Sequence, residues 1–161
     1  MTEIEPRRIW WARPRKLCAL ERPGGGGRSH RPERREAEIA WLRAAGVRLV
    51  ISTMRTRHNL EAYELAGLAS VYVPVESCKD GAAALDELVL LLRHELRSRG
   101  AVALHGNRRT DFVAAVCAAH LHDARGTDPA VGLAQAAAAG LTVTEDAARL
   151  LGVEWNALAA A

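Results

Sequence analysis

The sequence predicts an α/β domain whose central, mostly parallel sheet has four to five short strands and is flanked by helices. Segments with the apolar pattern of strands alternate along the chain with segments of helical periodicity, and such alternation is typical of a parallel sheet. The chain has 161 residues, the size of one ordinary domain. Hydrophobic residues make up 49% of it, so the domain can bury a core without metal or disulfide support.

The first predicted strands fall within residues 9–20, where Pro14 interrupts an apolar segment. Four consecutive glycines follow at Gly24–Gly27. Because an unfolded glycine segment loses much conformational entropy when it is ordered, residues 22–32 are predicted to form a flexible loop rich in glycine and arginine. This loop is too short to separate two domains.

The middle of the chain continues the alternation of helices and strands. Its clearest element is a helix with one apolar stripe, formed by Leu85, Leu88, Leu92 and Leu96 at helical spacing. The predicted elements are a helix over 33–45, a strand over 47–52, a helix over 59–66, a strand over 71–75, a loop over 76–81, a helix over 82–98 and a strand over 101–104.

A tight turn is predicted directly after the last of these strands, over residues 105–109. Thr110 is expected to cap the helix that follows, and two further helices are expected over 128–139 and 144–158. In a parallel sheet the site lies beyond the carboxyl ends of the strands. The sequence therefore places a site in the loops that follow Ser52, Val75 and Leu104, the last residues of three predicted strands.

Residues 9–158 are predicted to form one domain, with a loose N-terminus over 1–8 and a tail over 159–161. No apolar run is long enough to cross a bilayer, and the N-terminus lacks the apolar stretch of a secretory signal, so we expect a cytoplasmic protein without a membrane partner. Thiols stay reduced in that compartment. The three cysteines expected as free thiols are Cys18, Cys78 and Cys117.

Basic residues concentrate near the N-terminus. Between Arg7 and Arg35 there are ten Lys or Arg and two Glu, an excess of eight positive charges, whereas the whole chain carries a net charge of +3. Two interpretations are open for residues 7–35. They form either a solvated arm or a surface for an acidic partner, which would be a nucleic acid or an acidic protein.

One stretch resembles a known protein family. Residues 100–115, Gly-Ala-Val-Ala-Leu-His-Gly-Asn-Arg-Arg-Thr-Asp-Phe-Val-Ala-Ala, resemble the signature of the cysteine-dependent dual-specificity protein phosphatases. Flanking segments 11–24, 44–52 and 72–75 are similar to that family in order and spacing, so the resemblance covers residues 9–151 and is nearest to small atypical members. It implies a dual-specificity phosphatase-like fold and a link to phosphorylated proteins.

The chemistry of that family depends on a cysteine and a phosphate-binding loop. A strand ends in His-Cys, five loop residues follow, and Arg-Thr or Arg-Ser opens a helix. The cysteine thiolate attacks phosphorus, while the N–H groups of the loop and the Arg side chain hold the phosphate. An Asp from a separate loop protonates the leaving oxygen.

This sequence departs from the family at the cysteine. The resemblance places Gly106 at the cysteine position, with only two residues between it and Arg109. A second alignment, which would consume the preceding strand as loop, places Ala103 there instead. Asp111 replaces the Gly that follows Arg-Thr, and its carboxylate would repel a phosphate at the start of the helix.

The general acid of the family is altered as well. Its position falls near Ser77, and a hydroxyl cannot act as an acid near neutral pH. Glu76 and Asp80 are the candidate substitutes.

The remaining candidate nucleophiles and metal ligands are weaker. Cys117 lies on the apolar face of a predicted helix and is expected to be buried, whereas Cys78 is expected to be an ordinary exposed thiol, with a nucleophile as the alternative. His120 and His122 would point about 200° apart on one helix, and neither they nor His105 belong to a metal-ligand cluster. No metal and no cofactor are expected.

The sequence therefore predicts a catalytically inactive dual-specificity phosphatase-like domain that binds a phosphorylated protein or another oxyanion. Within this interpretation, Arg108 and Arg109 either hold the anion or pair with surface carboxylates. The remnant of the phosphate site would consist of His105, Gly106, Asn107, Arg108, Arg109 and Thr110.

Two alternatives stay open. One is an active protein phosphatase, a phosphoric monoester hydrolase with a non-standard site that uses Cys78 or a water molecule activated by Glu76 or Asp80. The other is a protein that binds nucleic acid or an acidic protein through residues 7–35.

Overall fold

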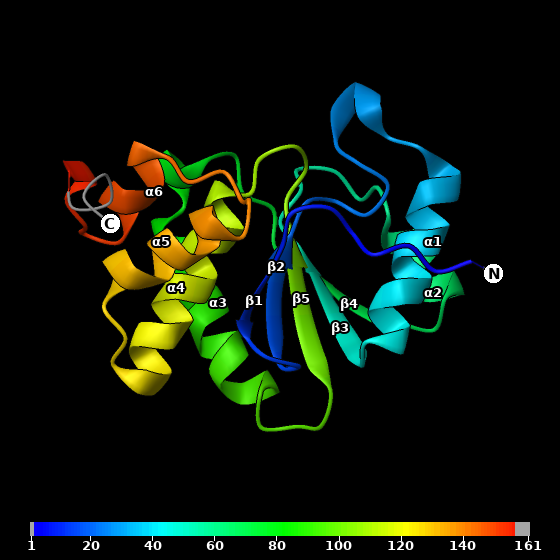
Figure 1. Ribbon diagram of the computed structural model, residues 1–161, viewed down its shortest axis with the longest axis horizontal. Coiled ribbons are helices and arrows are strands. Elements are labelled where there is room, and N and C mark those ends of the chain that lie inside the picture. Colours follow the sequence, from blue (N-terminus) through cyan, green and yellow to red (C-terminus); the bar gives the residue numbers. More distant parts are fainter. Residues whose placement is uncertain (1, 157–161) are drawn as a thin grey trace.

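A computed structural model of the chain describes residues 2–156. It contains one five-stranded sheet with the strand order β1-β2-β5-β3-β4 (Figure 1). β1 pairs with β2 in antiparallel fashion, and the other three pairings are parallel, which confirms the predicted sheet. The strands are β1 (Ile9–Arg13), β2 (Leu17–Leu20), β3 (Val47–Ser52), β4 (Ala69–Tyr72) and β5 (Ala101–His105).

Helices cover both faces of the sheet, with α1 and α2 on one face and α3 to α6 on the other (Figure 1). Within residues 2–156, none of these helices is long and apolar enough to cross a membrane. The helices are α1 (Pro32–Ala44), α2 (Leu60–Leu65), α3 (Ala82–Glu95), α4 (Asp111–Arg125), α5 (Pro129–Ala138) and α6 (Glu145–Leu150), with short 3-10 turns η1 (Gly27–Ser29) and η2 (Cys78–Asp80).

β5, at the centre of the sheet, shows how the sequence pattern builds the core. Successive side chains of a strand point to opposite faces. Val102 and Leu104 therefore pack with α3 and α4, while Ala101 and Ala103 pack with α1 and α2 on the other face. All four side chains are fully buried, which explains why this strand appears in the sequence as a continuous apolar run.

Several predicted boundaries are wrong: β4 ends at Tyr72, three residues before the predicted end of that strand, and α3 ends at Glu95, where the helix was predicted to reach residue 98. β4 begins at Ala69, two residues before the predicted strand, because the chain leaves the left-handed turn at Gly67 and immediately pairs with β3 from Leu49 onward. The predicted last helix is shorter than expected: α6 ends at Leu150 because Gly152, at φ 69°, closes it. Residues 157 and 158 of the predicted helix lie outside the described residues.

Candidate functional site

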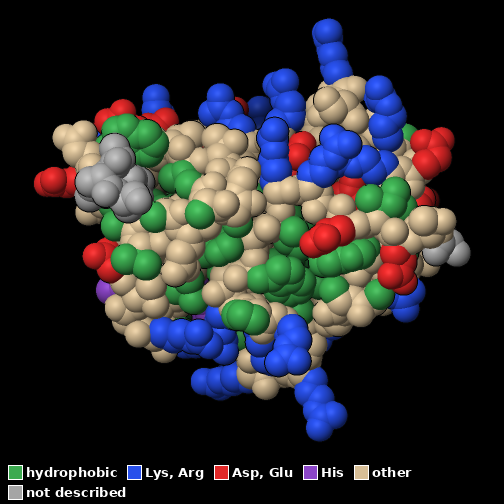
Figure 2. Space-filling model, viewed as in Figure 1, with side chains coloured by type: hydrophobic (Ala, Val, Ile, Leu, Met, Phe, Trp, Pro, Cys, Tyr) green, Lys and Arg blue, Asp and Glu red, His purple; other side chains and the backbone are tan. Residues whose placement is uncertain are grey.

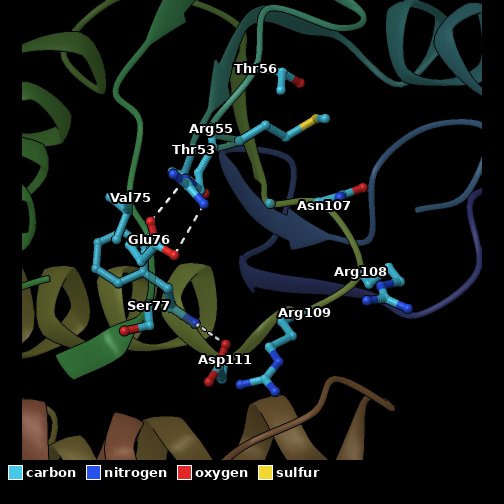
Figure 3. Close-up of a pocket in the computed structure, with 13 residues that line it drawn as sticks. Thr53, Arg55, Thr56, Val75, Glu76, Ser77, Asn107, Arg108, Arg109 and Asp111 are labelled. Carbon is cyan, nitrogen blue, oxygen red and sulfur yellow. Dashed lines mark hydrogen bonds and ion pairs between the residues drawn. The ribbon is translucent and has the colours of Figure 1, made fainter. Parts of the chain in front are cut away.

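The carboxyl ends of three parallel strands surround one cavity of about 260 Å³ (Figure 3). Its walls come from the segments that follow β3, β4 and β5, which are the three loops that the sequence predicts to carry a site. The lining residues are Thr53, Met54, Arg55, Thr56, Val75, Glu76, Ser77, Gly106, Asn107, Arg108, Arg109, Asp111 and Phe112. The strand order thus brings together polar groups that lie up to 58 positions apart in the sequence, from Thr53 to Asp111.

The turn between β5 and α4 forms the floor of the cavity. A Cβ atom added to Gly106 would lie 2.8 Å from the carbonyl oxygen of Arg109. The turn therefore folds its own backbone oxygen into the space that any side chain at this position needs. The turn is also tied to β3, because Thr53 donates to the His105 carbonyl oxygen from its backbone N–H at 2.9 Å and from its hydroxyl at 3.1 Å.

Two arginines extend from this turn toward solvent (Figure 3). Among residues 2–156, neither Arg108 nor Arg109 has a carboxylate partner within ion-pair distance, so the interpretation that they pair with surface acids receives no support there. The glycine-rich loop packs directly on the turn. A Cβ atom on Gly26 would lie 2.7 Å from Arg108, and the Gly27 N–H donates to Asn107 Oδ1 at 3.1 Å.

An ion pair between the loop after β3 and the loop after β4 lies on the opposite wall of the cavity (Figure 3). Glu76 binds Arg55 with both carboxylate oxygens, Oε2 to Nε at 2.8 Å and Oε1 to Nη1 at 3.1 Å. Ser77 lies beside this pair and also lines the cavity. Asp80 is exposed and lies outside the lining residues, so of the two candidate acids only Glu76 reaches the cavity.

Asp111 brings a buried carboxylate to the start of α4. Its Oδ2 accepts a hydrogen bond from the Thr144 hydroxyl at 2.9 Å, and its Oδ1 accepts from the Phe112 N–H at 3.0 Å. The negative charge therefore occupies the helix N-terminus, where an anion would otherwise be favoured. The cavity presents exposed cations at its rim and a fixed carboxylate near its floor.

Solved structures with this arrangement of elements come from phosphatases. Human DUSP28 matches with a TM-score of 0.69 and 22% identity, over 99% of this chain and 98% of that chain. P. aeruginosa TpbA matches with a TM-score of 0.73 and 16% identity, over 98% and 92%, and a mouse putative dual specificity phosphatase complexed with zinc tungstate matches with a TM-score of 0.68 and 20% identity, over 94% and 89%.

The chain has the dual-specificity phosphatase fold. No family model matches the sequence, and no curated protein sequence matches it either. The likeness therefore rests on three-dimensional structure at low identity, and the cavity lies where the carboxyl ends of the strands meet in this fold.

The three cysteines of this dual-specificity phosphatase fold are absent from the described residues that line the cavity. Cys18, Cys78 and Cys117 are all free and buried, and within the described residues none of the three lines the cavity. The expectation that Cys78 is exposed is wrong: its side chain is 3% exposed, and burial together with the carboxylate of Asp111 raises the pKa of its thiol to about 12. Such a thiol is protonated at neutral pH and is a poor nucleophile.

The helix cap predicted at Thr110 is formed differently. Thr110 does hold the position before α4, but its hydroxyl accepts from the Thr142 N–H at 2.8 Å and not from its own helix. Asp111 supplies the local acceptor instead, through the bond to Phe112. Thr110 is buried and does not line the cavity, so its hydroxyl is directed to structure.

His105 is a buried part of a hydrogen-bond chain and also does not line the cavity. Its Nδ1 lies 2.7 Å from the Gly106 carbonyl oxygen, which can only accept, so Nδ1 carries the hydrogen. Its Nε2 then accepts from the Tyr63 hydroxyl at 2.7 Å, and the Tyr63 oxygen accepts from Asn59 at 3.3 Å. Burial lowers the pKa of His105 to about 4, in agreement with this neutral ring.

His120 and His122 both lie on α4 but make different contacts. His120 is buried against Arg13, and His122 contacts the Thr127 carbonyl oxygen at the exposed end of α4. Across the part of the chain that the structure describes, no three His, Cys, Asp or Glu side chains come together as a metal site.

Sequence reasoning missed the residues that fix the turn from behind. Thr53 and Tyr63 hold His105 from two sides, and Asn59 continues the chain of hydrogen bonds to Arg22. One signal was available: Thr53 follows a buried strand directly, at the sheet edge where a site was predicted. Tyr63 and Asn59 carried no such signal. The partner of Tyr63 in this chain is His105, 42 positions away, and the partner of Asn59 is Arg22, 37 positions away.

Proposed function

We propose that this chain is a phosphatase-like domain without phosphatase activity, and that it binds a phosphorylated protein or another oxyanion at the turn after β5. One observation carries the proposal: the carbonyl oxygen of Arg109 would lie 2.8 Å from a Cβ on Gly106. A nucleophile at this position has no space, and a carbonyl dipole with its negative end there opposes an attacking or leaving oxygen.

The polar groups around the cavity support the absence of catalysis. Phosphate ester hydrolysis needs in-line attack and stabilisation of the charge that develops. Of the side chains that sequence analysis considered as nucleophile or acid, Cys78 is buried outside the cavity and Glu76 is engaged by Arg55. These positions count against the alternative of an active phosphatase with a non-standard site.

The binding role follows from the two exposed arginines of the turn. Arg108 and Arg109 have no carboxylate partner among the described residues, and guanidinium groups bind phosphate oxygens with two parallel hydrogen bonds. An anion is held at the rim by these side chains, because Asp111 repels it from the helix N-terminus. The tungstate in the mouse structure is an oxyanion of the same shape as phosphate.

Two measurements test this proposal on the full chain. Para-nitrophenyl phosphate should not be hydrolysed faster by the protein than by buffer. In a tungstate titration followed by NMR, the backbone amides of Asn107, Arg108 and Arg109 should shift, and the double substitution of both arginines by Ala should weaken that response by about tenfold. Arg99→Ala, an exposed arginine beyond α3, serves as the control and should change nothing.

Turnover of the aryl phosphate that Arg109→Ala abolishes would overturn the claim of inactivity. Tungstate shifts at residues 107–109 that survive the double substitution would overturn the binding role.

A second candidate function is recognition of a larger acidic partner through residues 7–35. Figure 2 shows Lys and Arg side chains gathered over the loop before α1, and Arg28 and Arg31 there are exposed. The contact of Gly26 with Arg108 joins this basic segment to the rim of the cavity. Affinity for an acidic partner would then fall steeply with salt, and a salt-insensitive complex would contradict this function.

We propose that the protein is located in the cytoplasm. All three cysteines are free, and reduced thiols are typical of proteins in a reducing environment.

A further inference from the structure

A second cavity, of about 540 Å³, lies between the glycine-rich loop, α1 and the start of α2. It belongs to a different set of residues from the cavity at the turn after β5. Three arginines and two histidines line it, together with two glutamates. These residues are Arg22, Arg35, Arg57, His30, His58, Glu36 and Glu61.

Arg22 is the unusual member of this set. Arg22 is only 6% exposed. Within the described residues, its guanidinium donates to a single acceptor, the amide oxygen of Asn59. Nε and Nη2 share that oxygen, at 3.1 and 3.0 Å. A guanidinium has five N–H donors, and buried charges are normally paired with an opposite charge.

Asn59 cannot supply a counter-charge, because its amide is neutral, and its other hydrogen-bonding group is already in use. Its Nδ2 donates to the Pro23 carbonyl oxygen at 3.0 Å and to the Tyr63 hydroxyl at 3.3 Å. Among residues 2–156, no carboxylate lies within ion-pair distance of Arg22. Burial lowers the pKa of Arg22, Tyr63 opposes this shift, and the nearby charge of Arg35 adds to it.

The rest of the cavity wall adds positive potential. Arg35 forms an ion pair with Glu36 at 2.9 Å, so Glu36 does not offset the charge of the other two arginines in the wall. His30 uses Nδ1 to donate to the Gly25 carbonyl oxygen at 2.9 Å, so in the neutral ring Nε2 is left as an acceptor for a ligand hydroxyl. Glu61 is the one lining carboxylate that has no ion-pair partner among the described residues.

We infer that this cavity is a second oxyanion site, in which the buried guanidinium of Arg22 binds a phosphate group, free or esterified. Phosphate fits better than a carboxylate because one tetrahedral centre can accept from the donors of Arg22 and, when it is monoprotonated, donate its P–OH to His30 Nε2. The volume of about 540 Å³ leaves room for the organic part of a phosphate ester.

The site is connected to the turn after β5 by buried hydrogen bonds. Arg22 binds Asn59, Asn59 binds Tyr63, and Tyr63 binds His105, whose Nδ1 donates to the Gly106 carbonyl oxygen. The two cavities therefore share one polar chain, although they share no lining residue.

The test is a titration of the full chain with inorganic phosphate and, separately, with O-phosphotyrosine, at constant ionic strength and followed by NMR. Both probes should shift the side-chain Nε–H signal of Arg22 and the amides of residues 57–59. Arg35→Gln should weaken binding by about fivefold, because it removes a cation and frees the charge of Glu36. Arg43→Gln changes the same charge on the same helix outside the cavity and should leave affinity unchanged.

One substitution is expected to strengthen phosphate binding, and a loss of folding could not produce that result. Glu61→Gln removes an exposed carboxylate from the cavity wall and should tighten binding by about threefold. Arg22→Lys keeps the charge but loses the planar fork, and should abolish the response if the variant retains the wild-type NMR spectrum elsewhere.

Binding of O-phosphotyrosine but not inorganic phosphate would assign the site to esters, and the reverse would assign it to the free ion. An unshifted Arg22 signal with both probes, or equal affinities in the Glu61→Gln, Arg35→Gln and Arg43→Gln proteins, would overturn the inference. Such a result would not contradict oxyanion binding at the turn after β5, because that binding is tested separately through residues 107–109.

Discussion

On the cavity side of the turn after β5, Arg55, Glu76 and the two arginines of the turn are exposed, whereas behind the turn the polar groups are buried and joined to one another. Arg55 and Glu76 form an ion pair in which the side chains are 68% and 55% exposed. Tyr63 and His105, behind the turn, are fully buried and share a hydrogen bond of 2.7 Å. Exposed ion pairs contribute little to stability, while a broken buried hydrogen bond costs a full desolvation penalty.

This contrast separates the residues that stabilise the turn from the residues that are available to bind a ligand. The buried side fixes the shape of the turn, and the exposed side leaves arginine side chains available to a ligand. Substitutions behind the turn should therefore change the free energy of unfolding, and substitutions in front of it should change binding alone. Four predictions test this contrast, from the largest expected effect to the smallest.

The largest effect is expected from protonation of His105. Burial lowers its pKa from 6.5 to about 4 in the folded protein, so between these values the unfolded chain binds more protons. Stability contributed by the neutral ring is complete above pH 6.5 and is lost as the pH falls toward 4, by about 3 kcal/mol. Urea unfolding at a series of pH values measures this loss.

His105→Gln should flatten that pH dependence, whereas the same substitution at His94, which is exposed on α3, should not. An unchanged slope in His105→Gln would show that another group carries the effect. His30 and His120, whose pKa values burial also lowers, would be the next candidates.

Gly106→Ala should be next in size. The added Cβ meets the Arg109 carbonyl oxygen at 2.8 Å, so the turn must move, and we expect a loss of about 2 kcal/mol in the free energy of unfolding. The comparison is Gly67→Ala, where φ is 75° but no atom lies within 4 Å of the new Cβ, and where about 1 kcal/mol is expected. Equal losses at the two glycines would mean that the Gly106 position has room after all.

Tyr63→Phe removes the hydroxyl between Asn59 and His105, so His105 Nε2 loses its donor and Asn59 Nδ2 loses one of its two acceptors. We expect a loss of about 1–2 kcal/mol in chemical unfolding. Tyr72→Phe is the matched control, because Tyr72 also donates one hydrogen bond, to the Arg55 carbonyl oxygen at 2.8 Å, but it does so at the exposed surface. A Tyr72→Phe loss as large as that of Tyr63→Phe would remove the contrast between the two sides.

The smallest effect should come from Glu76→Gln on the cavity side. The substitution breaks an exposed ion pair with Arg55, so thermal unfolding should report a change of about 0.5 kcal/mol or less. The freed Arg55 adds one cation to the cavity wall and should strengthen the tungstate response at residues 107–109. A strong destabilisation would show that this ion pair supports the loop after β4.

The sequence predicted the sheet and the location of the cavity well, because both follow from local pattern. β5 is a continuous apolar run between a glycine and a histidine, and the rule for parallel sheets then places a site beyond its end. The exact start of β4 was beyond this reasoning, since pairing with β3 decides it and not the residues of β4 themselves.

The interior of the site could not be predicted for a related reason. Cys78 lies in a predicted loop and carries no local sign of burial, yet the packing of η2 against α6 and α3 buries it. Arg22 belongs to a basic segment that resembles a solvated arm, and only the fold places it against Asn59 with the rest of its charge unanswered. Long-range contacts of this kind leave no periodic trace in a sequence.

A crystal structure of the protein with tungstate tests the central claim most directly. The claim predicts that the ion contacts the side chains of Arg108 and Arg109 while the Arg109 carbonyl oxygen stays beneath Gly106. A ring of backbone N–H groups from residues 106–110 closed around the ion, with that carbonyl turned away, would contradict it.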